Sequence, residues 1–199
     1  MVQKTDEPPR RRGRPRGFEP NDVLKAASER FRTHGFAGTS LDDLVDATGL
    51  QRPSLYAAFG DKRAIYLATL DRTLARSATG FDNLIAAGLP LRESLDQMFR
   101  IIIDGYMTGE SAPSGCIMVS TSSTSAVDDL AVRERLAAFL KLEDDKIAEL
   151  LAARGDASAK AHARVIAAVI HSLSVRARAG ASRDELDALA ADCIAMVAG

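Results

Sequence analysis

Apolar residues recur along this chain at intervals of three and four positions, the spacing that places them on one face of an α-helix. No stretch alternates apolar and polar residues as a half-buried strand does, so the expected fold class is all-α. The pattern predicts successive helices over residues 20–33, 41–48, 53–59, 62–79, 91–107, 116–125, 129–155, 158–179 and 183–197.

The second and third of these helices are separated by residues typical of a tight turn. Ser40, with Asp43 three residues later, can satisfy the free amides of a first helical turn. Gly49 can adopt the left-handed conformation that ends the helix, and Pro53 suits the first position of the next one. Asp61 can cap a further helix. This layout is that of a helix-turn-helix.

The outward face of the second short helix carries Arg52, Ser54 and Tyr56. An Arg side chain can fork onto guanine in a major groove, and hydroxyls can reach bases or phosphates. An ordinary pair of core helices is the alternative, but the exposed face favours a DNA-reading module. Lys62, at the start of the next helix, is expected beside a bound DNA backbone. The candidate DNA-binding residues of the module are Ser40, Arg52, Pro53, Ser54, Tyr56 and Lys62.

Residues 1–18 are rich in Pro and Arg and lack periodicity, so they are expected to form a disordered basic arm. Within it, the segment Arg12-Gly13-Arg14-Pro15-Arg16 looks like the core of an AT-hook, which lies in the narrow minor groove of A·T-rich DNA. The alternative is a solvated basic tail that only raises non-specific affinity. Arg12 and Arg14 are the candidate minor-groove residues.

The turn region contains a connected set of residues, namely Thr39-Ser40, Leu44, Thr48-Gly49-Leu50, Ser54-Leu55-Tyr56, Phe59 and Asp61-Lys62. This set resembles the signature of the tetracycline-repressor (TetR) family of bacterial transcriptional regulators. The resemblance runs from about Pro20 to Leu70, and the later chain matches in layout more than in motif. It implies a homodimeric repressor that binds a palindromic operator in double-stranded DNA and is released by a small-molecule effector.

The expected domains are the basic arm, a helix-turn-helix DNA-binding domain over residues 19–66, and a helical ligand-binding and dimerisation domain over residues 67–199. The resemblance implies that the last two long helices pair with their twofold mates in a four-helix bundle. An intramolecular core is the alternative role for these two helices.

Composition agrees with this division. Residues 1–76 carry 14 Lys and Arg against 10 Asp and Glu, whereas the remaining chain carries 12 against 17. The positive half contains the helix-turn-helix, which is consistent with phosphate contact there. No apolar run is long enough to span a membrane and the N-terminus has no apolar signal region, so a cytoplasmic protein without a membrane partner is expected.

The C-terminal half combines apolar and aromatic residues with a few polar groups, the usual composition of a small-molecule cavity between helices. For each candidate residue, packing in the core is the alternative. The candidate ligand-binding residues are Phe99, Ile102, Tyr106, Cys116, Met118, Phe139 and His171.

Cys116 also supports a second hypothesis, that of a thiol-based redox or electrophile sensor with the same fold. Some TetR-like regulators sense oxidants with a cysteine in the ligand domain, and a helix start can lower the pKa of a thiol. The alternative is a small buried hydrophobic residue.

Catalytic chemistry is not indicated. None of the three histidines has a metal-ligand partner at helical spacing, and the sequence contains no nucleophile motif or phosphate-binding loop. The two cysteines are far apart, which argues against a disulfide framework and a zinc site. Neither a metal nor a cofactor is expected, and a helical enzyme or carrier domain is the remote alternative.

Overall fold

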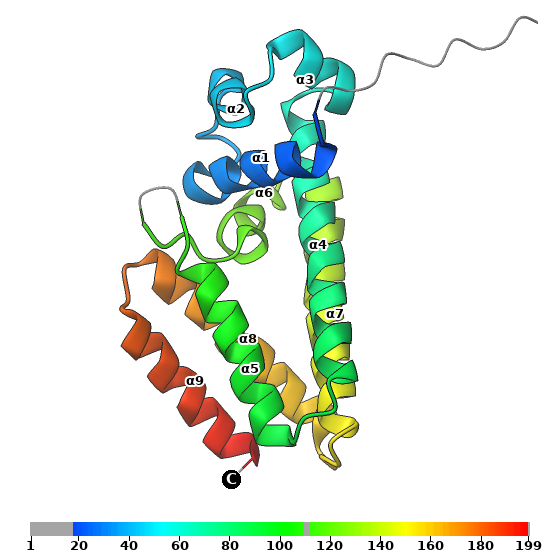
Figure 1. Cartoon of the computed structure of the whole chain (residues 1–199), viewed down its shortest axis with the longest axis vertical. Helices are drawn as coiled ribbons and strands as arrows, with labels where there is room; N and C mark the ends of the chain where they lie inside the picture. Colours follow the sequence, from blue (N-terminus) through cyan, green and yellow to red (C-terminus); the bar gives the residue numbers. More distant parts are fainter. Residues whose placement is uncertain (1–17, 110–111, 199) are drawn as a thin grey trace, which may run out of the picture.

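The computed structural model describes residues 18–109 and 112–198, and this part of the chain contains helices and no strand. The all-α prediction is therefore confirmed. A π-helical turn over Met118–Ser122 leads into the short α6. The α-helices are α1 (Pro20–His34), α2 (Leu41–Thr48), α3 (Arg52–Phe59), α4 (Lys62–Ala86), α5 (Leu91–Tyr106), α6 (Ser123–Ser125), α7 (Leu130–Ala152), α8 (Ala159–Arg178) and α9 (Arg183–Ala198) (Figure 1).

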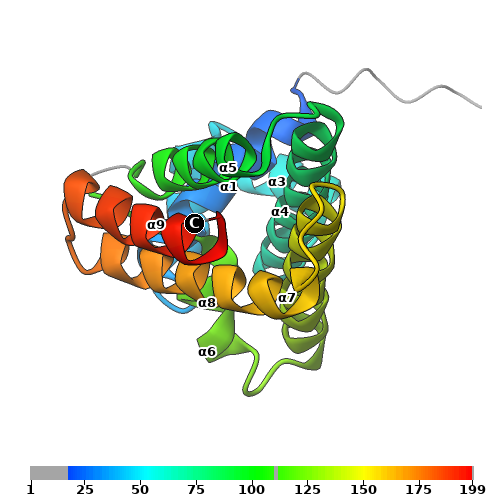
Figure 2. The same cartoon turned by 90° about the horizontal axis from the view of Figure 1, so that it is seen from below.

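Helices α1, α2 and α3 form one end of the molecule, and α4 runs from this end along α7 toward the other. Helix α5 packs on α8 and α9, and α8 packs on α7. Seen from below, these helices and α4 are arranged in a ring (Figure 2). The structure thus joins a small helical module to a larger helical domain through α4.

The predicted turn chemistry of the small module is present. The Ser40 hydroxyl accepts a hydrogen bond from the Asp43 amide at 3.1 Å, and the Asp43 carboxylate accepts one from the Ser40 amide at 2.7 Å. Gly49 ends α2 with a φ of 68°, in the left-handed region that favours glycine. The Asp61 carboxylate caps α4 by accepting from the Ala64 amide at 2.7 Å. Helix α3 begins one residue before Pro53.

Helix α4 extends beyond its expected end near residue 79 and continues to Ala86. Gly80 lies within the helix, where a glycine costs about 1 kcal/mol relative to alanine. Phe81 and Leu84, however, are buried in the core of the larger domain. Burying one such side chain stabilises a fold by about 1.5–3 kcal/mol, so tertiary packing outweighs the local cost.

Two apolar clusters hold the fold together. One lies within the larger domain and includes Phe99, Ile147 and Ile170. The other begins in α1, α2 and α3 and continues through α4 to Met118 and Phe139. The small module therefore shares a continuous core with the π-helical turn and with α7. Within the described ranges, none of the helices is long and apolar enough to cross a membrane.

Candidate DNA interface and effector site

The exposed face of α3 carries the residues expected to read DNA. Arg52, Pro53, Ser54 and Tyr56 are all exposed, whereas Leu55 between them is buried in the core of the small module. The structure therefore brings four of the predicted DNA-binding residues together on one open surface. Base or phosphate contact by each of them stays a prediction.

Arg52 has a partner that sequence analysis did not identify. Its guanidinium donates to the Asp42 carboxylate of α2, with a distance of 3.1 Å from Nε to Oδ1. This pairing raises the pKa of Arg52 and joins the starts of α2 and α3 on the protein surface. The pair is highly exposed, so its contribution to stability is small, and DNA bases can compete for the guanidinium. The two residues are ten positions apart, and helical periodicity within one helix cannot indicate such a contact.

Lys62 does not lie on the open face. Its ammonium donates to the backbone carbonyls of Phe36 and Thr39, both at 2.9 Å, and lies 4.3 Å from the centre of the Phe36 ring. The side chain thus fastens the first residue of α4 to the segment before α2, instead of standing free beside a bound backbone. Ser40 is likewise engaged in capping α2. Phosphate contact by either residue stays a prediction, and Arg12 and Arg14 lie outside the described residues.

Six of the seven candidate ligand-binding residues belong to the two apolar clusters or pack against them, and Cys116 packs against both. Phe99 and Tyr106 are buried in the cluster of the larger domain, with Ile102 packed against it. Met118 and Phe139 belong instead to the cluster that the larger domain shares with the small module. For these two, the core-packing alternative describes the observed environment. Ligand contact by any of the seven residues stays a prediction.

A buried polar group lies between the candidate residues of α5 and α8. The carboxylate of Glu143, on α7, is 2.7 Å from Nε2 of His171, and Glu143 is only 3% exposed. Burial raises the pKa of Glu143, and the hydrogen bond and charge of His171 partly offset this effect. Burial also raises the pKa of Tyr106, to which Cys116 and Glu143 contribute. Tyr106, Cys116, Glu143 and His171 therefore form one polar cluster in the larger domain.

Glu143 was not identified from the sequence. It begins the acidic run Glu143-Asp144-Asp145, which is typical of a solvated helix face. Its inward position could have been predicted from its spacing of four residues from both Phe139 and Ile147, which places all three on the inward face of α7.

Cys116 lies in an environment that disfavours the thiolate. Burial raises the pKa of its thiol to about 11, and the nearby amides of Val119 and Met118 offset only part of this increase. The thiol is therefore protonated near neutral pH, and protonated thiols are poor nucleophiles. This weighs against the redox-sensor hypothesis.

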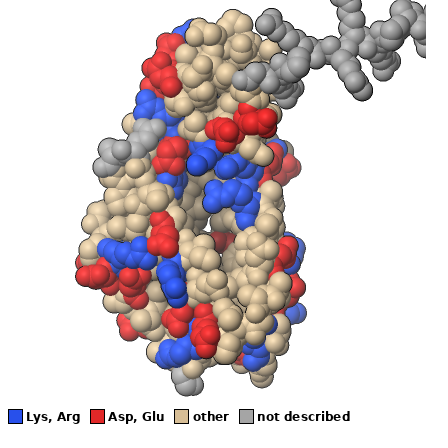
Figure 3. Space-filling model, viewed as in Figure 1, with Lys and Arg blue, Asp and Glu red and all other residues tan. Residues whose placement is uncertain are grey.

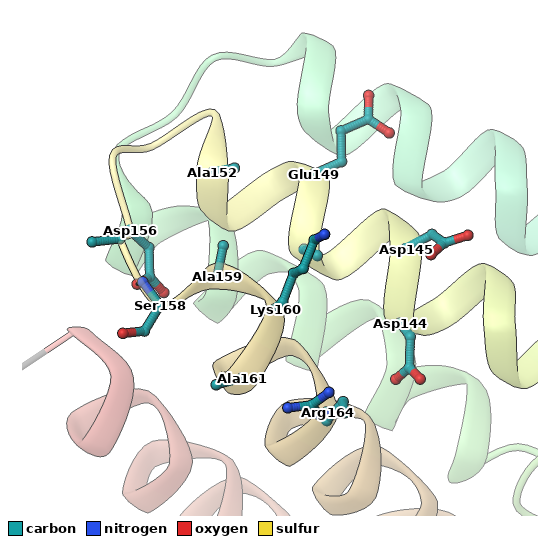
Figure 4. Close-up of a pocket in the computed structure, with 12 residues that line it drawn as sticks. Asp144, Asp145, Glu149, Ala152, Asp156, Ser158, Ala159, Lys160, Ala161 and Arg164 are labelled. Atoms are coloured by element: carbon teal, nitrogen blue, oxygen red, sulfur yellow. The ribbon is translucent and has the colours of Figure 1, made fainter.

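Two depressions lie on the outer surface of the larger domain, and none of the seven candidate residues lines either of them. One is an open, charged hollow where α7 meets α8, with Asp144, Glu149, Lys160 and Arg164 around it (Figure 4). The other is a shallow groove along α8, whose lining combines small and apolar residues with two arginines. It is lined by Ala161, Arg164, Val165, Ala168, Val169, Ser172, Arg176 and Leu189.

The end of α1 is tied to the larger domain by two arginines. Arg178, at the end of α8, donates to the backbone carbonyls of Arg32 at 2.6 Å and Thr33 at 3.1 Å. Arg32 in turn donates to the carbonyl of Gly105 at 2.8 Å and to the hydroxyl of Thr108 at 3.0 Å. The guanidinium of Arg178 satisfies carbonyls at the negative end of the α1 dipole. The small module therefore has a connection to the larger domain in addition to α4.

Comparison with known proteins agrees with the arrangement of helices. Residues 23–69 match the family model for bacterial regulatory proteins of the tetR family. The transcriptional repressor ComR of Escherichia coli K12 is 31% identical over 183 residues, which cover 88% of this chain and 87% of ComR. The repressor BdcR of the same organism is 29% identical, with coverage of 90% and 89%.

Among solved structures, the TetR-family regulator CifR is 26% identical, with a TM-score of 0.70 and coverage of 92% of this chain and 98% of the CifR chain. That structure is of a cysteine mutant in complex with 26-base-pair operator DNA. The family model, the relatives and the shared fold lead to one conclusion: this chain belongs to the TetR family and is a DNA-binding transcriptional regulator, not an enzyme.

Proposed function

We propose that this regulator is a homodimeric repressor that binds a palindromic operator in the cytoplasm and is released by a small molecule in its C-terminal domain. The observation that carries the proposal is the exposed face of α3, joined by α4 to a domain with a buried polar cluster. Two relatives that match over 87% and 89% of their own length are named repressors, and CifR is seen on operator DNA. The proposed domains are the arm over residues 1–18, the DNA-binding domain over 19–66 and the effector and dimerisation domain over 67–199.

The uncovered side of α8 and α9 supports the dimer. Val165 and Val175 of α8 are 44% and 56% exposed, and Met196 of α9 is 68% exposed. Ala161 and Ala168 line the groove on α8, and small residues allow two helices to approach closely. A second copy placed on this face by a twofold axis would bury the apolar side chains of both protomers.

Dimerisation would also allow the α3 helices of two protomers to bind the two half-sites of one operator. Two recognition helices that enter successive major grooves must lie roughly 34 Å apart. An effector that favours another separation weakens both half-sites together, because its binding energy is coupled to that of the operator. The test is to enrich random duplex DNA with the purified protein and to sequence the bound fraction. We expect a palindrome with half-site centres about 10 base pairs apart or a multiple of this spacing. Enrichment of a single unpaired motif, or of no sequence, would contradict the proposal.

Arg52→Ala is expected to weaken binding to the enriched operator by about 1–3 kcal/mol and to relax base preference, because a bidentate contact with guanine would be lost. Titrations against the operator and its single-base variants measure both effects. Arg92→Ala, which removes an exposed arginine from α5, is the matched control and should bind as the parent does. Parental affinity and selectivity in Arg52→Ala would show that the proposed reading face is wrong.

Arg178→Ala is expected to loosen the end of α1, because hydrogen bonds to the carbonyls of Arg32 and Thr33 would be lost. Hydrogen exchange should become about tenfold faster or more for amides in the last turn of α1, since each such bond to a charged group contributes about 1.5–3 kcal/mol. Arg176→Ala is the control, because Arg176 bonds only to Ser172 of its own helix within the described chain. Equal protection in both variants would mean that Arg178 does not hold α1.

A further inference from the structure

The charged side chains of α4 fall into two groups. Arg63 pairs with Asp129, Asp71 with Arg135 and Asp82 with Lys146, and each of these pairs joins α4 to α7 or to its N-cap. Lys62 binds two backbone carbonyls of the DNA-binding module.

Arg72 and Arg76 form the second group. Within residues 18–109 and 112–198, neither guanidinium forms a hydrogen bond or an ion pair, although Arg72 is half-buried. They are the charged residues of α4 without such a partner in this part of the chain.

The two arginines share one side of α4, because residues four apart on a helix lie above one another. Residues two apart point in nearly opposite directions, so Arg72 and Arg76 face away from Leu70 and Leu74, which pack into the shared core. Asp22 of α1 acts on the charge of Arg72, which places Arg72 near the start of α1. The arginines therefore lie below α1 on the face of α4 that turns away from α7.

This face of the molecule is hollowed. In the space-filling view, Lys and Arg side chains gather at the upper border of a hollow in the middle of the face, below α1 and beside α4 (Figure 3). Helices α4 and α5 lie on its two sides, and the domain behind them has the apolar and aromatic core that includes Phe99, Ile103 and Tyr106. An apolar compound entering here would pass a cationic border.

The arrangement of like charges favours an anion at this border. Partial burial and the repulsion of Arg76 lower the pKa of Arg72, and the attraction of Asp22 offsets only part of this effect. An anion between the two guanidinium groups would relieve the repulsion and accept hydrogen bonds from both. The planar fork of Arg matches the two oxygens of a carboxylate. The buried carboxylate of Glu143 in the same domain is hydrogen-bonded to His171.

We propose that the effector of this regulator is an organic carboxylate, whose carboxylate group binds Arg72 and Arg76 and whose apolar body enters the C-terminal domain between α4 and α5. The inference rests on the proposed release by a small molecule and specifies its chemistry. A single negative charge on an apolar body fits two cationic groups in front of an apolar core. Arg72 follows Lys62 by ten residues, about 15 Å along the helix, so the ligand would bind α4 close to the DNA-binding module.

The test uses straight-chain carboxylates from butanoate to dodecanoate, together with alkylamines and alkanols of matched length. Calorimetry measures their binding to the parent, to Arg72→Gln/Arg76→Gln and to the control Arg92→Gln. We expect at least one carboxylate to bind the parent and the control, and to bind the double variant about tenfold more weakly or worse, since charge-assisted hydrogen bonds are lost. The matched amines and alcohols should bind the parent more weakly than the carboxylate. Thermal unfolding of each unliganded variant establishes that it is folded.

Equal affinity of a carboxylate for parent and double variant would overturn the proposal, as would preference for the amine or failure of every carboxylate to bind. A parallel operator titration separates this inference from the proposed function. If a carboxylate binds through both arginines and operator affinity is unchanged, the anion site stands and the release by this ligand falls. If an amine or alcohol releases the operator equally from parent and double variant, release by a small molecule stands and the carboxylate inference falls.

Discussion

Val165→Glu is expected to separate the proposed dimer into monomers and to lower operator affinity by about a hundredfold or more. Val165 is 44% exposed on α8, so the substitution leaves the fold of one protomer intact. In a twofold dimer the change brings two carboxylates into a buried apolar interface, where an unpaired charge is strongly disfavoured. Loss of the second half-site then removes the gain from bivalent binding, typically a factor of 10²–10⁴. Sedimentation at micromolar concentration and operator titration measure the two effects.

Ile101→Glu is the matched control for this experiment. Ile101 is 60% exposed but lies on α5, away from the groove on α8. The control should remain dimeric and bind the operator as the parent does. A dimeric Val165→Glu variant, or a parent that sediments as a monomer, would show that this face is not the interface.

Gly115→Ala is expected to lower the free energy of unfolding by about 3 kcal/mol, through backbone strain and overpacking together. Gly115 has a φ of +66°, and a Cβ atom there would lie 2.5 Å from the backbone oxygen of Ser174 and 2.8 Å from its Oγ. The obstruction is backbone of α8, which cannot rotate away as a side chain can. The neighbouring Cys116 amide donates to the same Ser174 Oγ at 2.8 Å, so the substitution would also disturb that bond.

Urea unfolding measures this effect, with Gly80→Ala as the control. Gly80 lies within α4 and nothing lies within 4 Å of a Cβ added there. An alanine at such a helical position should stabilise the protein by about 0.5–1 kcal/mol. The two substitutions are therefore expected to change the free energy of unfolding in opposite directions. A Gly115→Ala variant as stable as the parent would show that α8 can move away from this turn.

Local chemistry in the sequence was sufficient to predict most of the helix ends. Ser40 with Asp43, Gly49 and Asp61 act within three or four residues of their own positions, and the structure shows each of these caps. The exposed set on α3 could be predicted for the same reason, because Leu55 fixes which side of a short helix faces inward.

Contacts between distant segments could not be predicted in this way. Arg178 binds carbonyls of α1 that are more than 140 residues earlier in the chain, and such a contact depends on how the helices pack. Glu143 was not predicted to be buried because it begins a run of acidic residues, although its helical spacing places it on the inward face of α7. The continuation of α4 past Gly80 likewise depended on partners for Phe81 that the local sequence does not specify.

The attachment of Lys62 couples a tilt of α4 to a movement of the DNA-binding module. The helix has 25 residues, and at 1.5 Å per residue it is about 37 Å long. A tilt of about 5° around its far end would displace its first turn by roughly 3 Å, which is close to the rise of one base pair. Because Lys62 fastens that first turn to the segment before α2, the module would follow the displacement instead of absorbing it. In the proposed dimer, a very small angular change in each C-terminal domain would therefore put both recognition helices out of register with their grooves.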